Sequence, residues 1–208
     1  METLHSILPY IRFVGSGVGG KPTIQFGAVN VQVVNGDGRT ESVNGEGNLV
    51  IGYDENPENK FHERRAQTGS HNLILGEVQT FTSYGGILAG AGNTISAPFA
   101  SVTAGDQNTA SGEDASVSGG NKNTASALWA SVTGGTENAA SNELASVSGG
   151  VQNHASGEFT SITGGGSNTA SGNTAAIQGG FKNVAEGNFS SIFGGKEVTV
   201  KGTYEYMP

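Results

Sequence analysis

The chain has 208 residues and a formal net charge of −8, with 35 glycines, no cysteine and only 13% charged residues. So many glycines argue against a helical protein, because each costs about 1 kcal/mol relative to alanine in a helix interior. The missing cysteines exclude disulfides and thiolate metal sites, the negative charge argues against binding nucleic acid or anionic membranes, and no apolar run is long enough to cross a bilayer.

The N-terminal segment, residues 1–15, combines helix-like spacing of Leu4, Ile7, Leu8 and Ile11 with an interrupting Pro9. We expect a short segment that is the end of an oligomerising coiled coil. It lacks the basic-then-apolar pattern of a secretory signal, so we expect that the protein leaves the cell by another route or that its start is truncated.

Residues 16–69 are predicted to form a β-rich N-terminal cap. The stretch TIQFGAVNVQVV alternates apolar and polar residues, with Gly27 shifting the phase as a β-bulge would, and NGDG then supplies a turn. The strand-like sequences NLVIG and NLILG flank a charged loop over residues 53–71. Such a loop either clamps neighbouring chains through salt bridges or projects as a functional element. Its candidate residues are Glu63, Arg64 and Arg65.

Residues 70–195 carry a 15-residue repeat. Read in steps of fifteen from Gly85, the units are GGILAGAGNTISAPF, ASVTAGDQNTASGED, ASVSGGNKNTASALW, ASVTGGTENAASNEL, ASVSGGVQNHASGEF, TSITGGGSNTASGNT, AAIQGGFKNVAEGNF and SSIFGGKEVTVKGTY. Eight consecutive units stay in register, which a chance pattern does not do. Period-two alternation indicates two short strands per unit. The predicted fold is all-β, a short-coil parallel β-roll or β-solenoid with about 15 residues per coil.

One position in each predicted strand is assigned to the core. The third position of every unit is β-branched: Ile87, Val102, Val117, Val132, Val147, Ile162, Ile177 and Ile192. The second strand buries Ala110, Ala125, Ala140, Ala155, Ala170 and Ala185, with Ile95 and Val200 in the end coils. A near-constant glycine pair marks a turn too tight for a Cβ atom.

A column of asparagines recurs once per coil: Asn93, Asn108, Asn123, Asn138, Asn153, Asn168 and Asn183. Stacked coils bring equivalent residues about 4.8 Å apart, where identical amides can hydrogen-bond in a ladder. Asparagine also tolerates left-handed turn geometry. We interpret the column as a structural turn-and-ladder feature, with a ligand-binding row of amides as the alternative.

The core of such a coil is thin, because each unit offers it one β-branched residue and one alanine. Ordering fifteen residues costs more than this burial contributes, and ladders between coils recover only part of the difference. We therefore expect further burial between chains, in a homo-oligomer.

The last position of each unit forms an apolar stripe. Its residues are Phe99, Asp114, Trp129, Leu144, Phe159, Thr174 and Phe189. If the strand extends this far, these side chains point outward, and an exposed apolar stripe marks an interface. The candidates for contact with sister chains in a trimer, or with a partner, are Phe99, Trp129, Leu144, Phe159 and Phe189. The alternative is a carbohydrate or protein ligand that stacks on Trp129 and Phe159.

Residues 196–208 are predicted to be a C-terminal cap. Val198 replaces the asparagine, and Lys196, Glu197 and Lys201 introduce charge. Charge at the last ladder edge protects a solenoid against end-to-end growth.

The pattern S-V-x-G-G…N-x-A-S-G over about residues 70–195 resembles the head repeats of YadA-like trimeric autotransporter adhesins. The sequences NGEGNLVIGYDE and GSHNLILG, together with SSIFGGKE, are similar to those of related bacterial repeat proteins. The resemblance implies a trimer of parallel β-rolls stacked beside a threefold axis, and attachment to host or matrix molecules. The repeat here is one residue longer than the usual head coil.

Enzyme chemistry is not expected, and neither catalytic nor cofactor nor metal residues are predicted. The histidines His5, His62, His71 and His154 have no metal-ligand spacing with carboxylates. Glycine-rich stretches such as GGGSNTASG lack the lysine of a phosphate-binding loop and recur in every coil.

The sequence therefore predicts a non-catalytic structural or adhesive fibre or head module, located outside the cell or on its surface. It would bind a surface, or a glycan or protein partner, without inserting into a membrane. One alternative is a segment of a phage-type or injection-machine tail fibre. Another is an ice-binding solenoid, although Ala139 and Val184 break the required threonine column of Thr94, Thr109, Thr124 and Thr169.

Overall fold

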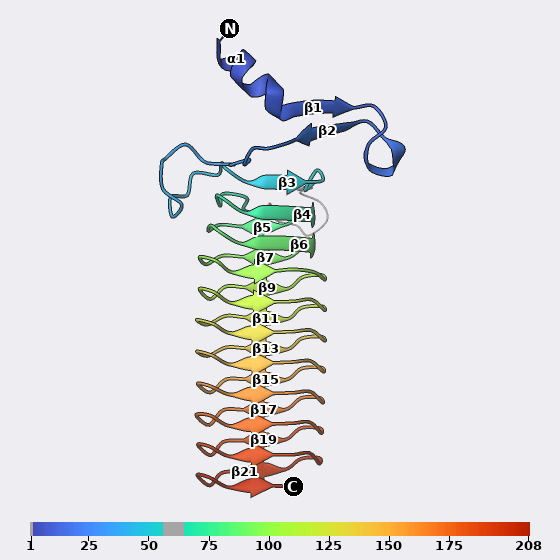
Figure 1. Ribbon diagram of the computed structural model, residues 1–208. Helices are drawn as coiled ribbons and strands as arrows, with labels where there is room; N and C mark the ends of the chain where they lie inside the picture. The colour runs from blue at the N-terminus through green and yellow to red at the C-terminus, as the bar shows by residue number, and fades with distance from the viewer. Residues whose placement is uncertain (1, 56–64) are drawn as a thin grey trace. The chain divides into compact units, whose positions relative to one another are not determined.

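The computed structural model describes residues 2–55 and 65–208 and divides into two compact units, Met1–Val33 and Val34–Pro208. The fold is nearly all-β, and its main part is a parallel β-solenoid of about nine turns with about 15 residues per turn. The solenoid predicted from the repeat is thus confirmed (Figure 1).

The first unit is a short helix followed by a hairpin. Its elements are α1 (Glu2–Ile7), a 3₁₀ turn (Leu8–Tyr10), β1 (Ile11–Val14), a second 3₁₀ turn (Val18–Gly20) and β2 (Thr23–Phe26). The α-helix ends at Ile7, and Pro9 lies in the 3₁₀ turn that follows it. β1 pairs antiparallel with β2, and the alternation predicted beyond Gly27 does not continue as a strand. None of residues 5–33 is buried.

In the second unit each coil from β4 to β21 contributes one strand to each of two parallel sheets, and β3 and β22 add one strand at either end of the 11-stranded sheet only. The 11-stranded sheet contains β3 (Leu49–Ile51), β4 (Leu73–Glu77), β6 (Ile87–Ala91), β8 (Ser101–Val102), β10 (Ser116–Val117), β12 (Ser131–Val132), β14 (Ser146–Val147), β16 (Ser161–Ile162), β18 (Ala176–Ile177), β20 (Ser191–Ile192) and β22 (Tyr206–Met207). The 9-stranded sheet contains β5 (Thr80–Phe81), β7 (Thr94–Ile95), β9 (Thr109–Ala110), β11 (Thr124–Ala125), β13 (Ala139–Ala140), β15 (His154–Ala155), β17 (Thr169–Ala170), β19 (Val184–Ala185) and β21 (Thr199–Val200). Residues 196–208 extend both sheets.

The core lies between the two sheets. The predicted valines and isoleucines from Val102 to Ile192 are buried, as are the predicted alanines and the end residues Ile95 and Val200. A third column, which the sequence analysis left unassigned, is also buried. It consists of Ala100, Ala115, Ala130, Ala145, Thr160, Ala175 and Ser190. Each coil therefore contributes three small or medium side chains to a narrow core.

The prediction that Ile87 lies in the core is wrong. Ile87 is 40% exposed, whereas its neighbour Leu88 is 0% exposed and pairs with Ile74 and Val102 in the core column. Leu88 and Val102 are fourteen residues apart, whereas the next paired residues, Ala91 and Asp106, are fifteen apart. The additional residue of the regular coil therefore lies in the turn between Val102 and Asp106. Because side chains alternate between the faces of a strand, this one-residue difference exchanges inside and outside.

The second glycine of each pair is required by the stacking. Gly135 has a φ of 85°, in the left-handed region that favours glycine. A Cβ atom there would overlap the carbonyl oxygen of Gly150 in the next coil, whereas a Cβ atom at Gly134 would meet nothing. The glycine pair thus combines one strict position with one permissive position.

Candidate functional site

The asparagine column is buried and fully engaged in hydrogen bonds to the backbone. The Oδ1 atom of Asn123 accepts the backbone N–H of Asn138 at 3.0 Å. Its Nδ2 group donates to the carbonyl of Gly119 at 2.9 Å and to that of Gly135 at 2.9 Å. The same three bonds recur at Asn138, Asn153 and Asn168. The ladder thus joins side chain to backbone and not amide to amide, and it leaves no amide of these residues facing a ligand.

The ladder begins with two residues that the sequence analysis did not include. Gln79 lies fourteen residues before Asn93, accepts the N–H of Asn93 at 3.0 Å and donates to the Gly90 carbonyl at 2.7 Å. The N–H of Gln79 is in turn accepted by the Asp54 carboxylate at 3.0 Å, and Gln67 donates to the same carboxylate at 2.9 Å. Burial raises the pKa of Asp54, against the lowering effect of its bond from Gln79. The fourteen-residue spacing is the signal that locates Gln79.

A shorter asparagine ladder closes the opposite turn of the first coils. The Oδ1 atom of Asn48 accepts the N–H of Asn72 at 2.9 Å, and Asn72 accepts the N–H of Gly86 at 2.9 Å. Beyond Gly86 the column continues with alanine, beginning at Ala100. The first coils therefore use polar side chains where the regular coils use apolar ones.

The stripe lies in a turn and not at the end of a strand. Each of its residues has a φ near +55°, and Trp129 donates its N–H to the carbonyl of Glu113, one coil earlier, at 3.0 Å. This geometry directs the side chain out of the coil. Trp129, Leu144 and Phe159 are 49%, 40% and 48% exposed.

Ring pairs close both ends of the stripe. Tyr84 contacts Phe99 edge-to-face with centroids 5.3 Å apart, and Phe189 stacks on Tyr204 at 4.9 Å. Within the described residues, Trp129 and Phe159 form no such pair. We call Trp129, Leu144 and Phe159 the central patch.

Carboxylates surround the central patch. Glu143 and Glu158 directly precede Leu144 and Phe159 in their turns, and Glu113 and Asp114 occupy the turn before Trp129. None of the stripe turns from 97–99 to 187–189 contains a lysine or arginine. The opposite turns carry both signs: Asp106, Lys122, Glu137, Lys182, Lys196 and Glu197. The edge that bears the stripe is thus both aromatic and acidic.

The outward face of the 11-stranded sheet changes character along the solenoid. In β3, β4 and β6 the paired outward residues are aliphatic except at the ends of β4 and β6, where Glu77 pairs with Ala91; the aliphatic ones are Leu49, Ile51, Leu73, Leu75, Ile87 and Ala89. In the following coils they are Ser101, Thr103, Ser116, Ser118, Ser131, Thr133, Ser146, Ser148, Ser161, Thr163, Ala176, Gln178, Ser191 and Phe193. Apart from Glu77, these outward positions are uncharged, which is unusual for a face that only contacts water.

The outward face of the 9-stranded sheet carries a threonine array of limited length. Thr80, Thr94, Thr109 and Thr124 pair in register along four successive strands. Ala139 and His154 follow, and Val184 interrupts the column again. His154 is exposed and lies 2.9 Å from the Ser141 hydroxyl. The array is therefore regular over only part of the sheet.

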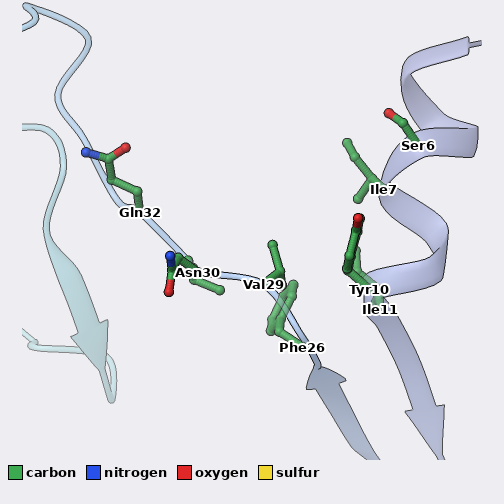
Figure 2. Close-up of a pocket in the computed structure, with 9 residues that line it drawn as sticks. Ser6, Ile7, Tyr10, Ile11, Phe26, Val29, Asn30 and Gln32 are labelled. Atoms are coloured by element: carbon green, nitrogen blue, oxygen red, sulfur yellow. The ribbon is translucent and has the colours of Figure 1, made fainter.

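The first unit holds an open apolar cavity of about 390 Å³. Figure 2 shows Ile7 and Tyr10 on one side of it, facing Phe26 and Val29 on the other. All four side chains are exposed, so the cavity is a surface hollow and not an enclosed site.

The loop candidates are only partly described. Glu63 and Arg64 lie outside the described residues, and Arg65 is half-buried. In the described ranges, no group of three or more His, Asp or Glu side chains is arranged to hold a metal ion. None of the helices in those ranges is long and apolar enough to cross a membrane.

Comparison with known proteins leaves the chain without an assigned family. No protein-family model matches the sequence, and no curated protein matches it.

Proposed function

We propose that this chain is a non-catalytic fibre or adhesin-like head module, which assembles as a homotrimer outside the cell or at its surface and binds a partner through the stripe. The observation that carries the proposal is repetition. Exposed aromatic side chains recur at every second coil along the stripe, and no place in the described part of the solenoid gathers them around one reacting atom. Such a surface suits multivalent contact with an extended partner.

Two surfaces support self-association. The outward face of β3, β4 and β6 is mainly aliphatic, and the outward positions of the strands from β8 to β20 are uncharged. The first unit buries none of its residues from 5 to 33 although Phe13, Ile24 and Val31 are large and apolar. Apolar surface of this extent marks interfaces in soluble proteins, and parallel copies related by an axis along the solenoid would cover the aliphatic part of the sheet.

Sedimentation of the purified chain tests the assembly. A trimer is expected at three times the chain mass of 21.0 kDa, and a monomer at micromolar concentration would contradict it. Leu73→Ser on the aliphatic face should weaken the trimer, because it removes apolar area from the proposed interface. Ser131→Ala, on the hydroxyl part of the same face, is the matched control and should sediment as the unmodified protein does.

Replacing Trp129 and Phe159 by serine tests the stripe. If the stripe binds a partner, the variant stays trimeric and loses binding to its target surface. If the stripe packs between sister chains, the variant dissociates, and the proposed role of the stripe is wrong.

A further inference from the structure

Aromatic rings occupy the stripe at every second coil. The aromatic members are Phe99, Trp129, Phe159 and Phe189, and they alternate with Asp114, Leu144 and Thr174. Neighbouring strands lie about 4.7–4.9 Å apart, so rings two coils apart are separated by roughly 9.5 Å along the solenoid axis. A ligand that meets several of these rings is therefore elongated, runs along the axis and offers flat apolar faces at intervals.

Hydrogen-bonding groups border the rings. Glu143 and Glu158 stand in the same turns as the central patch, and one oxygen of Glu158 accepts from Asn173 at 3.0 Å. Ser141 precedes one of these turns, and Ser146 follows it. Rings bordered by carboxylates and hydroxyls combine apolar contact with polar groups that orient a ligand.

We propose that the central patch binds a linear polysaccharide of neutral or amino sugars, with the sugar chain lying along the solenoid axis. This rests on the proposed binding role of the stripe and specifies its ligand. The C–H faces of successive sugar rings pack on Trp129 and Phe159 with Leu144 between them, and sugar hydroxyls donate to Glu143 and Glu158. An amino group on the sugar would gain from both the ring faces and the carboxylates.

The acidic border disfavours the other occupants. A second copy that packed on the central patch about an axis along the solenoid would place Glu143 and Glu158 opposite like charges, which is unfavourable. Protein interfaces also exclude Asp and Glu from their cores. Polysaccharides that carry carboxylates or sulfates would be repelled by the same groups. Neutral and amino sugars meet none of these penalties.

Calorimetric titration of the intact chain with three oligosaccharides tests the proposal. The probes are the hexamer of β-1,4-linked N-acetylglucosamine, its deacetylated form and a hexamer of galacturonic acid. The N-acetylglucosamine hexamer and its deacetylated form are expected to bind. The galacturonic acid hexamer is expected to bind at least about tenfold more weakly, because its carboxylates are repelled by Glu143 and Glu158. Trp129→Ala should lower the affinity of the first two about tenfold, while Trp129→Phe, which keeps a stacking ring, should stay within about threefold.

Phe181→Ala is the matched control, because Phe181 is 44% exposed but lies in the opposite turns. It should leave binding within about twofold. The proposal is overturned if no neutral or amino hexamer binds, if Trp129→Ala binds as the unmodified protein does, or if galacturonate binds equally well. A Trp129→Ala variant that loses its oligomeric mass would make the patch an interface between copies. A monomeric chain that still binds the neutral hexamer would contradict the trimer and leave this proposal standing.

Discussion

In the coils from Asn48 to Ile95 the core is filled by Ile74, Phe81, Leu88 and Ile95, whereas the regular coils fill it mainly with valine, isoleucine and alanine. The steps between equivalent core residues are fourteen in the first group and fifteen in the second. The outward face is aliphatic in the first group and hydroxylated in the second. Both nevertheless share one polar ladder, from Gln79 through Asn93 to Asn183.

This contrast separates what a coil requires from what it tolerates. Core volume and coil length vary between the two regions. The buried amide and the glycine beside it do not, because each coil leaves a backbone N–H and glycine carbonyls inside the turn, where no water satisfies them. The polar ladder is therefore the common requirement. Four sets of substitutions test the contrast between the two regions, in order of expected effect.

The largest effect is expected from Asn123→Ala. It removes an acceptor for one buried N–H and a donor to two carbonyls, and each unsatisfied group costs about 1–3 kcal/mol. Urea unfolding followed by circular dichroism should show a loss of about 5 kcal/mol. Asn48→Ala, in the half-buried ladder of the first coils, should cost about half as much. Equal losses would mean that the two ladders are equivalent.

Gly135→Ala should cost about 4 kcal/mol, since it combines backbone strain with an overlap against the Gly150 carbonyl. Gly76→Ala should cost a similar amount, because a Cβ atom there would overlap the Gly90 carbonyl. Gly134→Ala has open space and serves as the control, with a change under about 1 kcal/mol. A neutral Gly76→Ala would show that the first coils are not stacked as tightly as the regular ones.

Leu88→Ala should lower the free energy of unfolding by about 3 kcal/mol, because it opens a cavity in the core. Ile87→Ala, one residue earlier on the outward face, should cost under about 1 kcal/mol in the isolated chain. Thermal unfolding distinguishes the two. A larger loss for Ile87→Ala than for Leu88→Ala would mean that Ile87 is the core residue, fifteen residues before Val102.

The smallest effect concerns Asp54 and its pH dependence. Burial raises its pKa in the folded state above the ordinary value of 3.8. The protonated form is thus favoured by folding, so this contribution to stability is complete below about pH 3.8 and is lost as the pH rises through the raised pKa. Asp54→Asn keeps an acceptor for Gln79 and removes the titration. The free energy of unfolding of this variant, relative to that of the unmodified protein, should be higher near pH 7 than near pH 4.

Urea unfolding at both pH values measures this difference. Ser131→Ala, which changes no ionisable group, is the control and should show a difference that hardly changes with pH. An advantage of Asp54→Asn that stays constant between the two pH values would show that this carboxylate does not titrate differently on folding.

The regular coils were predictable because their repeat is strict. Val117 and Ala125 were assigned to the core from period-two alternation, and the Asn123 column from its recurrence. Ile87 was assigned wrongly because Ile87 and Leu88 are both aliphatic, and alternation alone cannot choose between adjacent apolar residues. Gln79 was missed because it is a glutamine and the recurring residue of the column is asparagine. Its side-chain amide nevertheless makes the same ladder bonds.

The amino-acid sequence by itself determined the coil, its two strands, its inward residues and the glycine-bearing turn, because each follows from local alternation and backbone sterics repeated many times. The tertiary structure alone decided that Leu88 and not Ile87 faces the core, that Trp129 and Phe159 lie in a left-handed turn, and that Asp54 is linked to the ladder. These features depend on which backbone groups of one coil lie over those of the next. That registration arises only when the coils stack.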